Sequence, residues 1–197
     1  TLTVTVVDAL RIDQAEIPGG RVADAYDVVL TASGGTGSPV TYSLGAGSLP
    51  AGLTLTSDGR LTGTPTGPAG TYSVEVVAQN SDGQTASRWY TFTVAKGSTS
   101  LTASISLLTV IHLLKLSLRV SDVSARLVDA HGNPLAGRTV VFSGLGEVCR
   151  GVTGADGVAS CAPTLDGSSR ILRLGRVVAT FEGDDSYETS TDSDNVL

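Results

Sequence analysis

Short runs in which every second side chain is apolar constrain the fold of this chain most strongly. Residues 1–7 alternate Thr with Leu or Val, and the runs 70–78 and 90–94 follow the same period of two. This period is typical of a β-strand with one buried face. Gly, Asp-Gly and Pro separate the runs, which indicates tight turns between short strands. The sequence therefore predicts an all-β fold.

The length of the chain indicates two domains. A β-sandwich needs roughly 100 residues, and this chain has 197. We predict a first domain over residues 8–96, a small polar linker over 97–100 and a second domain over 101–197. The segment 1–7 shares its pattern with 91–94, the end of the first domain. It is interpreted as the last strand of a preceding repeat in a tandem array, or alternatively as the first strand of domain one.

The first half carries motifs that are specific enough to suggest a family. They are Leu49-Pro-Ala-Gly-Leu-Thr-Leu55, Asp58-Gly-Arg-Leu-Thr-Gly-Thr-Pro65 and Gly70-Thr-Tyr72. With these motifs the first half resembles a cadherin-related family of immunoglobulin-like (Ig-like) domains found in bacterial surface proteins. Modules of that family often stand in tandem.

The second half resembles a different group, the bacterial Ig-like repeats of invasin-like surface proteins. The resemblance rests on the segments 129–142, 153–159 and 179–187, which include Asp129-Ala-His-Gly-Asn-Pro134. Together the two resemblances imply two antiparallel Ig-like β-sandwiches in tandem. They also imply extracellular display at a cell surface, in spacing, adhesion or filament formation, without catalysis. The expected partners are neighbouring Ig-like modules or identical subunits, and another surface protein or a glycan is an alternative.

The apolar run 105–118 departs from the polar composition usual in such modules. It contains His112 and Lys115, so it is a poor membrane span. Alternation favours strands here, although a helix with an apolar stripe also fits the spacing. The run either supplies the first two strands of the second sandwich or has apolar surplus that contacts a neighbouring module or subunit. The candidate contact residues are Leu108, Ile111, Leu113 and Leu114.

The two cysteines, Cys149 and Cys161, flank the Ala155-Asp-Gly157 turn. Their spacing allows them to face each other across a hairpin, which predicts a cross-strand disulfide and an oxidising compartment. The alternative is a pair of buried free thiols.

Few residues suggest chemistry. The two histidines lie far apart in sequence, so we expect no catalytic residues and no zinc site. Asp24, Asp27 and Asp82 are weak calcium candidates, because cadherin-like relatives hold calcium with such oxygens; otherwise no cofactor is expected. The net charge of −6 argues against nucleic-acid binding.

Three functions remain open from the sequence. The first is a structural or adhesive module of a secreted, cell-surface or filament-forming bacterial protein. The second is an Ig-like accessory component of a phage virion. The third is a spacer or carbohydrate-binding region of a secreted enzyme, which would need an exposed aromatic platform. Trp89 beside Tyr90 is the candidate for that platform, and alternation turns one of the two inward.

Overall fold

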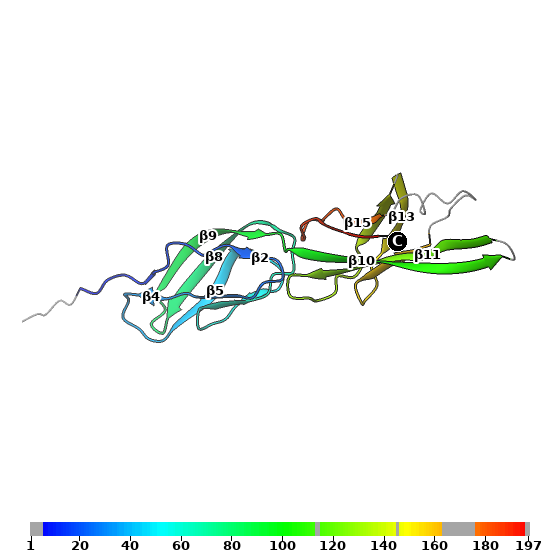
Figure 1. Cartoon of the computed structure of the whole chain (residues 1–197). Coiled ribbons are helices and arrows are strands. Elements are labelled where there is room, and N and C mark those ends of the chain that lie inside the picture. The colour runs from blue at the N-terminus through cyan, green and yellow to red at the C-terminus, as the bar shows by residue number, and fades with distance from the viewer. Residues whose placement is uncertain (1–5, 113–114, 145, 163–175, 196–197) are drawn as a thin grey trace, which may run out of the picture. The chain divides into compact units, whose positions relative to one another are not determined.

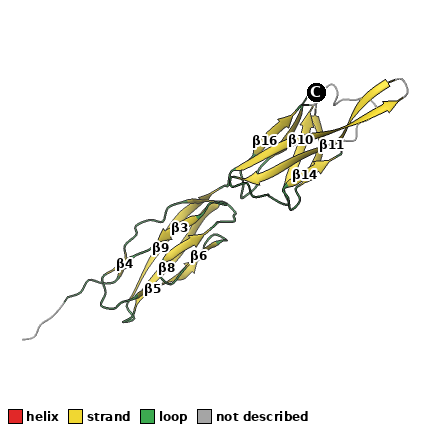
Figure 2. Cartoon of the chain, turned by 60° about the horizontal axis from the view of Figure 1, so that its bottom comes forward, coloured by secondary structure: helices red, strands yellow, loops and turns green. Residues whose placement is uncertain are grey.

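The structure is a computed structural model of the chain, and its regular elements are β-strands arranged in several sheets (Figures 1 and 2). It describes residues 6–112, 115–144, 146–162 and 176–195. The chain divides into two compact units, and the boundary between them lies between Lys96 and Gly97. The all-β prediction is confirmed.

The first unit is a sandwich of two sheets. One sheet has the strand order β2-β9-β8-β5 and the other has the order β3-β7-β6, while a short β1-β4 pair stands beside them. The strands are β1 (Arg11–Ile12), β2 (Gly20–Arg21), β3 (Tyr26–Val29), β4 (Ala32–Ser33), β5 (Val40–Gly47), β6 (Leu53–Leu55), β7 (Arg60–Gly63), β8 (Gly70–Asn80) and β9 (Thr85–Ala95).

The alternation of β8 and β9 builds the core of this unit. Their inward residues are Val74, Val76, Ala78, Tyr90, Phe92 and Val94, all at most 4% exposed. Burying one such side chain contributes roughly 1.5–3 kcal/mol. Phe92 also lies 6.3 Å from the ring of Tyr26, which the facing sheet supplies. The period-two pattern therefore becomes the contact surface between the two sheets.

One pairing in the first unit differs from the predicted antiparallel sandwich. β2 pairs with the end of β9 in parallel, with Gly20 opposite Val94. β2 therefore runs beside β9, the last strand of the unit, in the same direction. Gly19 makes this approach feasible, because a Cβ there would lie 2.9 Å from the Thr93 carbonyl oxygen.

The second unit is also a sandwich. One sheet has the order β10-β11-β14 and the other has the order β13-β12-β15-β16. The strands are β10 (Thr99–His112), β11 (Lys115–Asp129), β12 (Thr139–Gly144), β13 (Gly146–Val152), β14 (Val158–Cys161), β15 (Val177–Phe181) and β16 (Ser190–Asp194). Between the sheets lie side chains that are almost fully buried: Val123, Leu127, Val140, Phe142, Val177 and Ala179.

The linker prediction for residues 97–100 is wrong. Gly97 N–H donates to Ser186 O, Gly97 O accepts from Glu188 N–H, and Thr99 already pairs with Asp129 at the start of β10. These residues belong to the second unit, because their backbone groups find partners there. Their small polar side chains suit a strand edge as well as a linker.

The run 105–118 is strand, not helix, in the part that the structure describes. β10 and β11 form one long hairpin, and a β-bulge interrupts its register at Ser106/Leu107. β11 continues past the run to Asp129 without a break. Residues 113 and 114 lie outside the described residues.

Candidate interaction surfaces

The first candidate surface is the side of the β5-β8-β9 sheet that faces away from the core. We define this outward face by the side chains that alternate with the buried ones: Thr41, Ser43 and Gly45 on β5, Thr71, Ser73, Glu75, Val77 and Gln79 on β8, and Thr85, Ser87, Trp89, Thr91 and Thr93 on β9. Small residues and hydroxyls make up most of it. Trp89 is its one aromatic side chain, and Glu75 is its one charged side chain.

Trp89 is 57% exposed, whereas its neighbour Tyr90 is 2% exposed and donates from its hydroxyl to Gln14 O at 2.9 Å. Trp89 stands directly opposite Glu75 in the ladder between β8 and β9. The Glu75 carboxylate lies over Gly45, where a Cβ would be 2.6 Å from Oε2. Sequence alternation required one of the two adjacent aromatics to point outward, and the packing of Tyr90 decides which.

The second candidate surface is the distal hairpin, residues 107–120, beyond the bulge. Here β10 and β11 pair with each other, whereas β14 pairs with β11 over Val123–Arg126 alone. Figures 1 and 2 both show this part of the hairpin extending past the other strands of the unit. Among the described residues, its two outer edges carry no further strand. Of the predicted contact residues, Leu108 and Ile111 lie in β10, and Leu113 and Leu114 fall outside the described residues.

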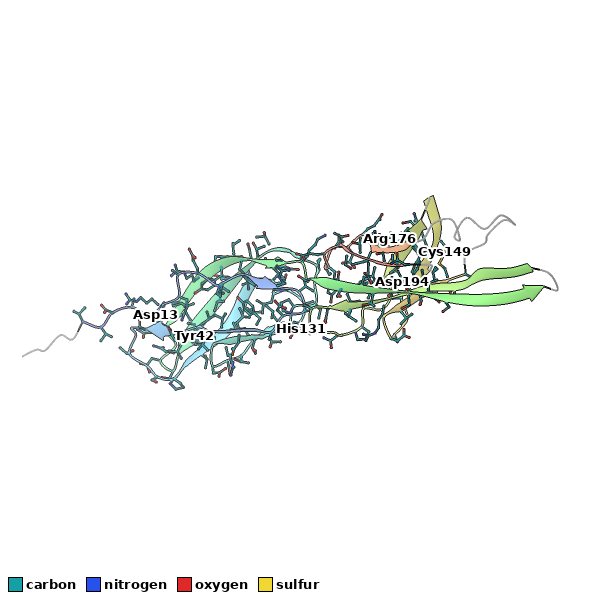
Figure 3. All side chains as sticks on the ribbon, viewed as in Figure 1. Asp13, Tyr42, His131, Cys149, Arg176 and Asp194 are labelled. Atoms are coloured by element: carbon teal, nitrogen blue, oxygen red, sulfur yellow. A yellow bond between two sulfur atoms is a disulfide. The ribbon has the colours of Figure 1, made fainter. Side chains whose placement is uncertain are left out.

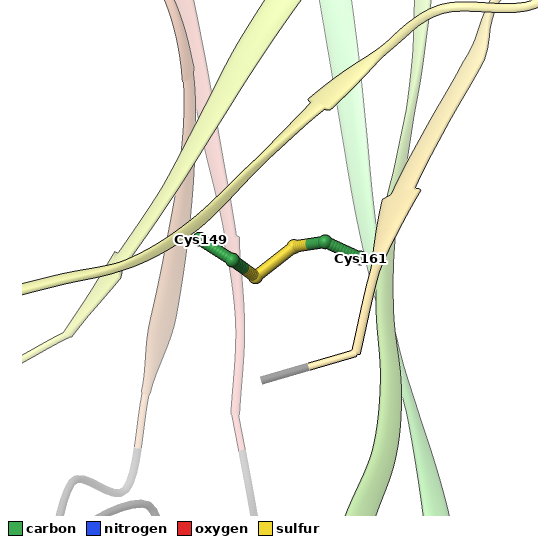
Figure 4. The surroundings of a disulfide bond; sticks show 2 residues. All are labelled: Cys149 and Cys161. Atoms are coloured by element: carbon green, nitrogen blue, oxygen red, sulfur yellow. A yellow bond between two sulfur atoms is a disulfide. The ribbon is translucent and has the colours of Figure 1, made fainter. Parts of the chain in front are cut away.

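The sandwich of the second unit has one side where the edge strands β13 and β14 meet. A disulfide joins Cys149 on β13 to Cys161 on β14, with a Cα–Cα distance of 6.3 Å (Figure 4). The two strands belong to different sheets, so the predicted placement across one hairpin is wrong. The disulfide links the sheets and leaves neither cysteine as a thiol nucleophile. Gly151 supports the same approach, since a Cβ there would lie 2.7 Å from Ser160 O.

The opposite side of the same sandwich is where β10 meets β16. Ala103 N–H donates to Asp192 Oδ2 at 2.9 Å, and Ile105 N–H donates to Asp194 Oδ2 at 3.2 Å. The hydrogen bond from Ala103, together with one from Ser193, holds the pKa of the Asp192 carboxyl below its usual value. The carboxylates thus satisfy edge amides that would otherwise be open to another strand. Figure 3 shows Asp194 and Cys149 in this unit.

The calcium candidates do not converge. Asp27 accepts two hydrogen bonds from Arg60, one of them at 2.8 Å, and the Arg60 contact lowers the pKa of this carboxyl. Asp82 accepts from Thr36 at 2.7 Å, and Asp24 lies in the turn after β2. Within the ranges that the structure describes, no three acidic, His or Cys side chains gather as a metal site would require.

A cavity of about 320 Å³ lies in the second unit between β12, β13 and the segment after β15. Arg138 and Arg150 line it from one side, and Glu182 and Asp184 from the other. Arg138 pairs with Asp184 at 2.8 Å and lies 5.6 Å from the centre of the Tyr187 ring. The ion pair with Asp184 and the contact with the Tyr187 ring fix the Arg138 side chain within the second sandwich.

His131 lies in the turn that Asp129 closes. Asp129 is 5% exposed, and its carboxylate accepts from His131 N–H, Asn133 N–H and the Asn133 side chain at 2.9–3.0 Å. Burial alone would raise the pKa of this carboxyl, but the three hydrogen bonds lower it below the usual value. The Asp-Ala-His-Gly-Asn-Pro motif is therefore a structural turn.

The chain consists of two Ig-like β-sandwich units. Residues 2–95 match the family described as "Putative Ig domain", so the first unit belongs to that family. The predicted resemblance of the first half is confirmed, whereas that of the second half to invasin-like repeats stays a prediction. Among curated proteins, none matches the sequence.

Several solved structures are similar at low identity. A tetra-tandem repeat from the extending region of a large adhesion protein is 17% identical, with 96% of this chain and 48% of that chain covered and a TM-score of 0.40. Cadherin domains 1–4 of protocadherin gamma B7 are 16% identical, with coverages of 95% and 49% and a TM-score of 0.41. A protein described as a "putative alpha-galactosidase" from Bacteroides fragilis is 24% identical, with coverages of 49% and 20% and a TM-score of 0.39. The chain thus spans half or less of these proteins.

No helix in the described residues is long and apolar enough to cross a membrane.

Proposed function

We propose that this chain is a non-enzymatic structural and adhesive segment of a secreted or cell-surface bacterial protein, with contacts to neighbouring Ig-like modules or identical subunits. The observation that carries the proposal is the disulfide between Cys149 and Cys161, which links the two sheets of the second unit. Disulfides persist in extracellular compartments and are rare where glutathione and thioredoxin keep thiols reduced. Membership of the first unit in an Ig-like family adds support.

The distal hairpin is the surface proposed for contact with a second copy. Within the ranges that the structure describes, both edges of this hairpin lack a partner strand, and such edges offer backbone donors and acceptors to another strand. The sequence of this hairpin is rich in Leu, Ile and Val, which favours burial on contact. Pairing of one hairpin edge with that of a second copy would satisfy both features, and repeated along a parent protein it would lead to filaments.

The test has two parts. Free and disulfide-bonded cysteines are counted by mass spectrometry after alkylation of the protein in its native source. A fully reduced pair of Cys149 and Cys161 would contradict export. Homotypic contact is followed by light scattering and by aggregation of beads coated with the chain. Leu108→Ser and Leu113→Ser should abolish the assembly, whereas Val152→Ser, which removes a 64% exposed apolar side chain elsewhere, should leave it intact. An assembly size that none of the three changes alters would refute the role of the hairpin.

A further inference from the structure

Trp89 is a large aromatic side chain that lies outside the core of the first unit. The side chain is 57% exposed, and no hydrogen bond or ring contact holds it among the described residues. Its indole face and its N–H are both available to a partner. Aromatic side chains of this kind are enriched at the centres of protein interfaces, since they combine a large apolar area with a polar group.

The surroundings of Trp89 specify the charge of a ligand. Of the side chains that define the outward face, Glu75 alone is charged, and it stands opposite Trp89 in the β8–β9 ladder. Directly opposite residues have Cβ atoms about 5 Å apart. No hydrogen bond or ion pair occupies the Glu75 carboxylate within the described part of the chain. The indole face is the negative side of the ring quadrupole, so both groups attract a cation.

The cation next to Trp89 in the sequence does not fill this place. Arg88 precedes Trp89 and alternates to the other side of β9, where its guanidinium lies 6.0 Å from the centre of the Tyr90 ring. Gly45 leaves the space over β5 to the Glu75 carboxylate, which therefore lies on the side of β8 away from Trp89 in this structure. Ser87 and Thr91, the outward neighbours of Trp89 along β9, are too short to cover the indole. Rotation of the Glu75 side chain toward β9 brings its carboxylate to the N–H groups of a guanidinium that lies on the ring.

We propose that the outward face binds an arginine side chain of a protein partner, with Trp89 as the stacking surface and Glu75 as the counter-charge. The inference rests on the adhesive role proposed above and names the chemistry of one contact. Arginine fits better than lysine, because its planar guanidinium stacks on an aromatic face and pairs with a carboxylate at the same time. The complementarity of charge favours this partner over a neutral glycan.

The chain offers a direct reporter, since Trp89 is its single tryptophan. The probe is the blocked peptide acetyl-Gly-Arg-Gly-amide, and the control peptide has citrulline, the neutral isostere, in place of arginine. Binding is followed by tryptophan fluorescence and by the shift of the one indole N–H resonance in NMR. One cation–π contact with one ion pair gives a dissociation constant on the order of tens of millimolar.

The expected result is saturation with the arginine peptide and binding roughly three- to tenfold weaker with the citrulline peptide. Glu75→Gln should weaken the arginine peptide to a similar degree and remove most of the salt dependence. The matched control is Asp8→Asn, which removes the same charge from an exposed residue in the segment before β1. Trp89→Leu removes both reporters, so binding to this variant is measured from the peptide by saturation-transfer difference NMR, and it should be lost. The fold should stay intact, because the Trp89 side chain is largely outside the core.

Equal binding of the two peptides, or no effect of Glu75→Gln, would overturn the inference. So would an indole resonance that shifts with maltotriose and not with the arginine peptide, since the face would then be a sugar site. The bead assay keeps the two proposals apart. If the coated beads still aggregate while the arginine peptide fails to bind, the adhesive role stands and the arginine site is wrong.

Discussion

Loss of the disulfide should destabilise the second unit and leave the first unchanged. The bond closes a loop between residues separated by 12 positions. In the chain-entropy account, a loop of this length contributes about 3 kcal/mol, because the cross-link restricts the unfolded chain. For a domain of about 100 residues, 1 kcal/mol corresponds to roughly 4–8 °C in Tm. We therefore expect the double change Cys149→Ala and Cys161→Ala to lower the Tm of the second unit by roughly 12–24 °C.

The assay separates the units by their reporters. Differential scanning calorimetry follows both transitions, and fluorescence of Trp89 follows the first unit, which holds the single tryptophan. Reduction of the wild-type chain should reproduce the shift, and the reductant should not affect the double variant. This comparison separates the cross-link from the loss of the sulfur atoms. A loss of unfolding free energy of the second unit below about 1 kcal/mol would refute the view that the disulfide constrains the second sandwich. A change in the Tm of the transition that Trp89 reports would refute it as well.

Three further predictions concern single positions. Asp129→Ala should destabilise the second unit by about 1–3 kcal/mol in urea unfolding, because three half-buried donors of the turn lose their acceptor. The folded-state pKa of Asp129 is lowered, so its stabilisation is present above the unfolded pKa near 4 and is lost as the pH falls through the folded value; an unchanged acid midpoint in the variant would contradict this. Gly151→Ala places a Cβ 2.7 Å from Ser160 O and should cost about 1–3 kcal/mol, whereas Gly70→Ala, with nothing within 4 Å, should be nearly neutral; equal effects would disprove the close approach. Burial raises the pKa of Tyr26 to about 12. The contribution of the neutral Tyr26 phenol to the stability of the first unit is therefore complete below the unfolded pKa near 10 and is lost as the pH rises through the folded value. Ultraviolet titration should show that this phenol ionises late, and ionisation near pH 10 in the folded state would refute its burial.

Much of the fold follows from local sequence. The period of two in 70–78 and 90–94 predicts which side chains of β8 and β9 are buried, and the Asp-Gly turns place the strand ends. The same period shows that one of Trp89 and Tyr90 points outward. It cannot choose between them, because the choice depends on which face the second sheet covers.

The contacts between sheets do not follow from local sequence. Cysteines twelve positions apart fit a hairpin and an inter-sheet bond equally well by parity, and only the separate sheets of β13 and β14 distinguish the two. Asp192 and Asp194 look like solvated acids at the end of the chain, but β16 places them on the edge amides of β10. Nothing in their local sequence signals that contact.

The sequence by itself determined the strands and turns, because these depend on residues close together in the chain. It also gave the two-domain count, which follows from chain length, and the family of the first unit, which follows from specific motifs. The tertiary structure decided which strand edges meet, which acids accept amide hydrogen bonds and which residue faces Trp89. Those outcomes depend on register between segments far apart in the chain, and a shift of one residue would turn Glu75 to the other face of its sheet.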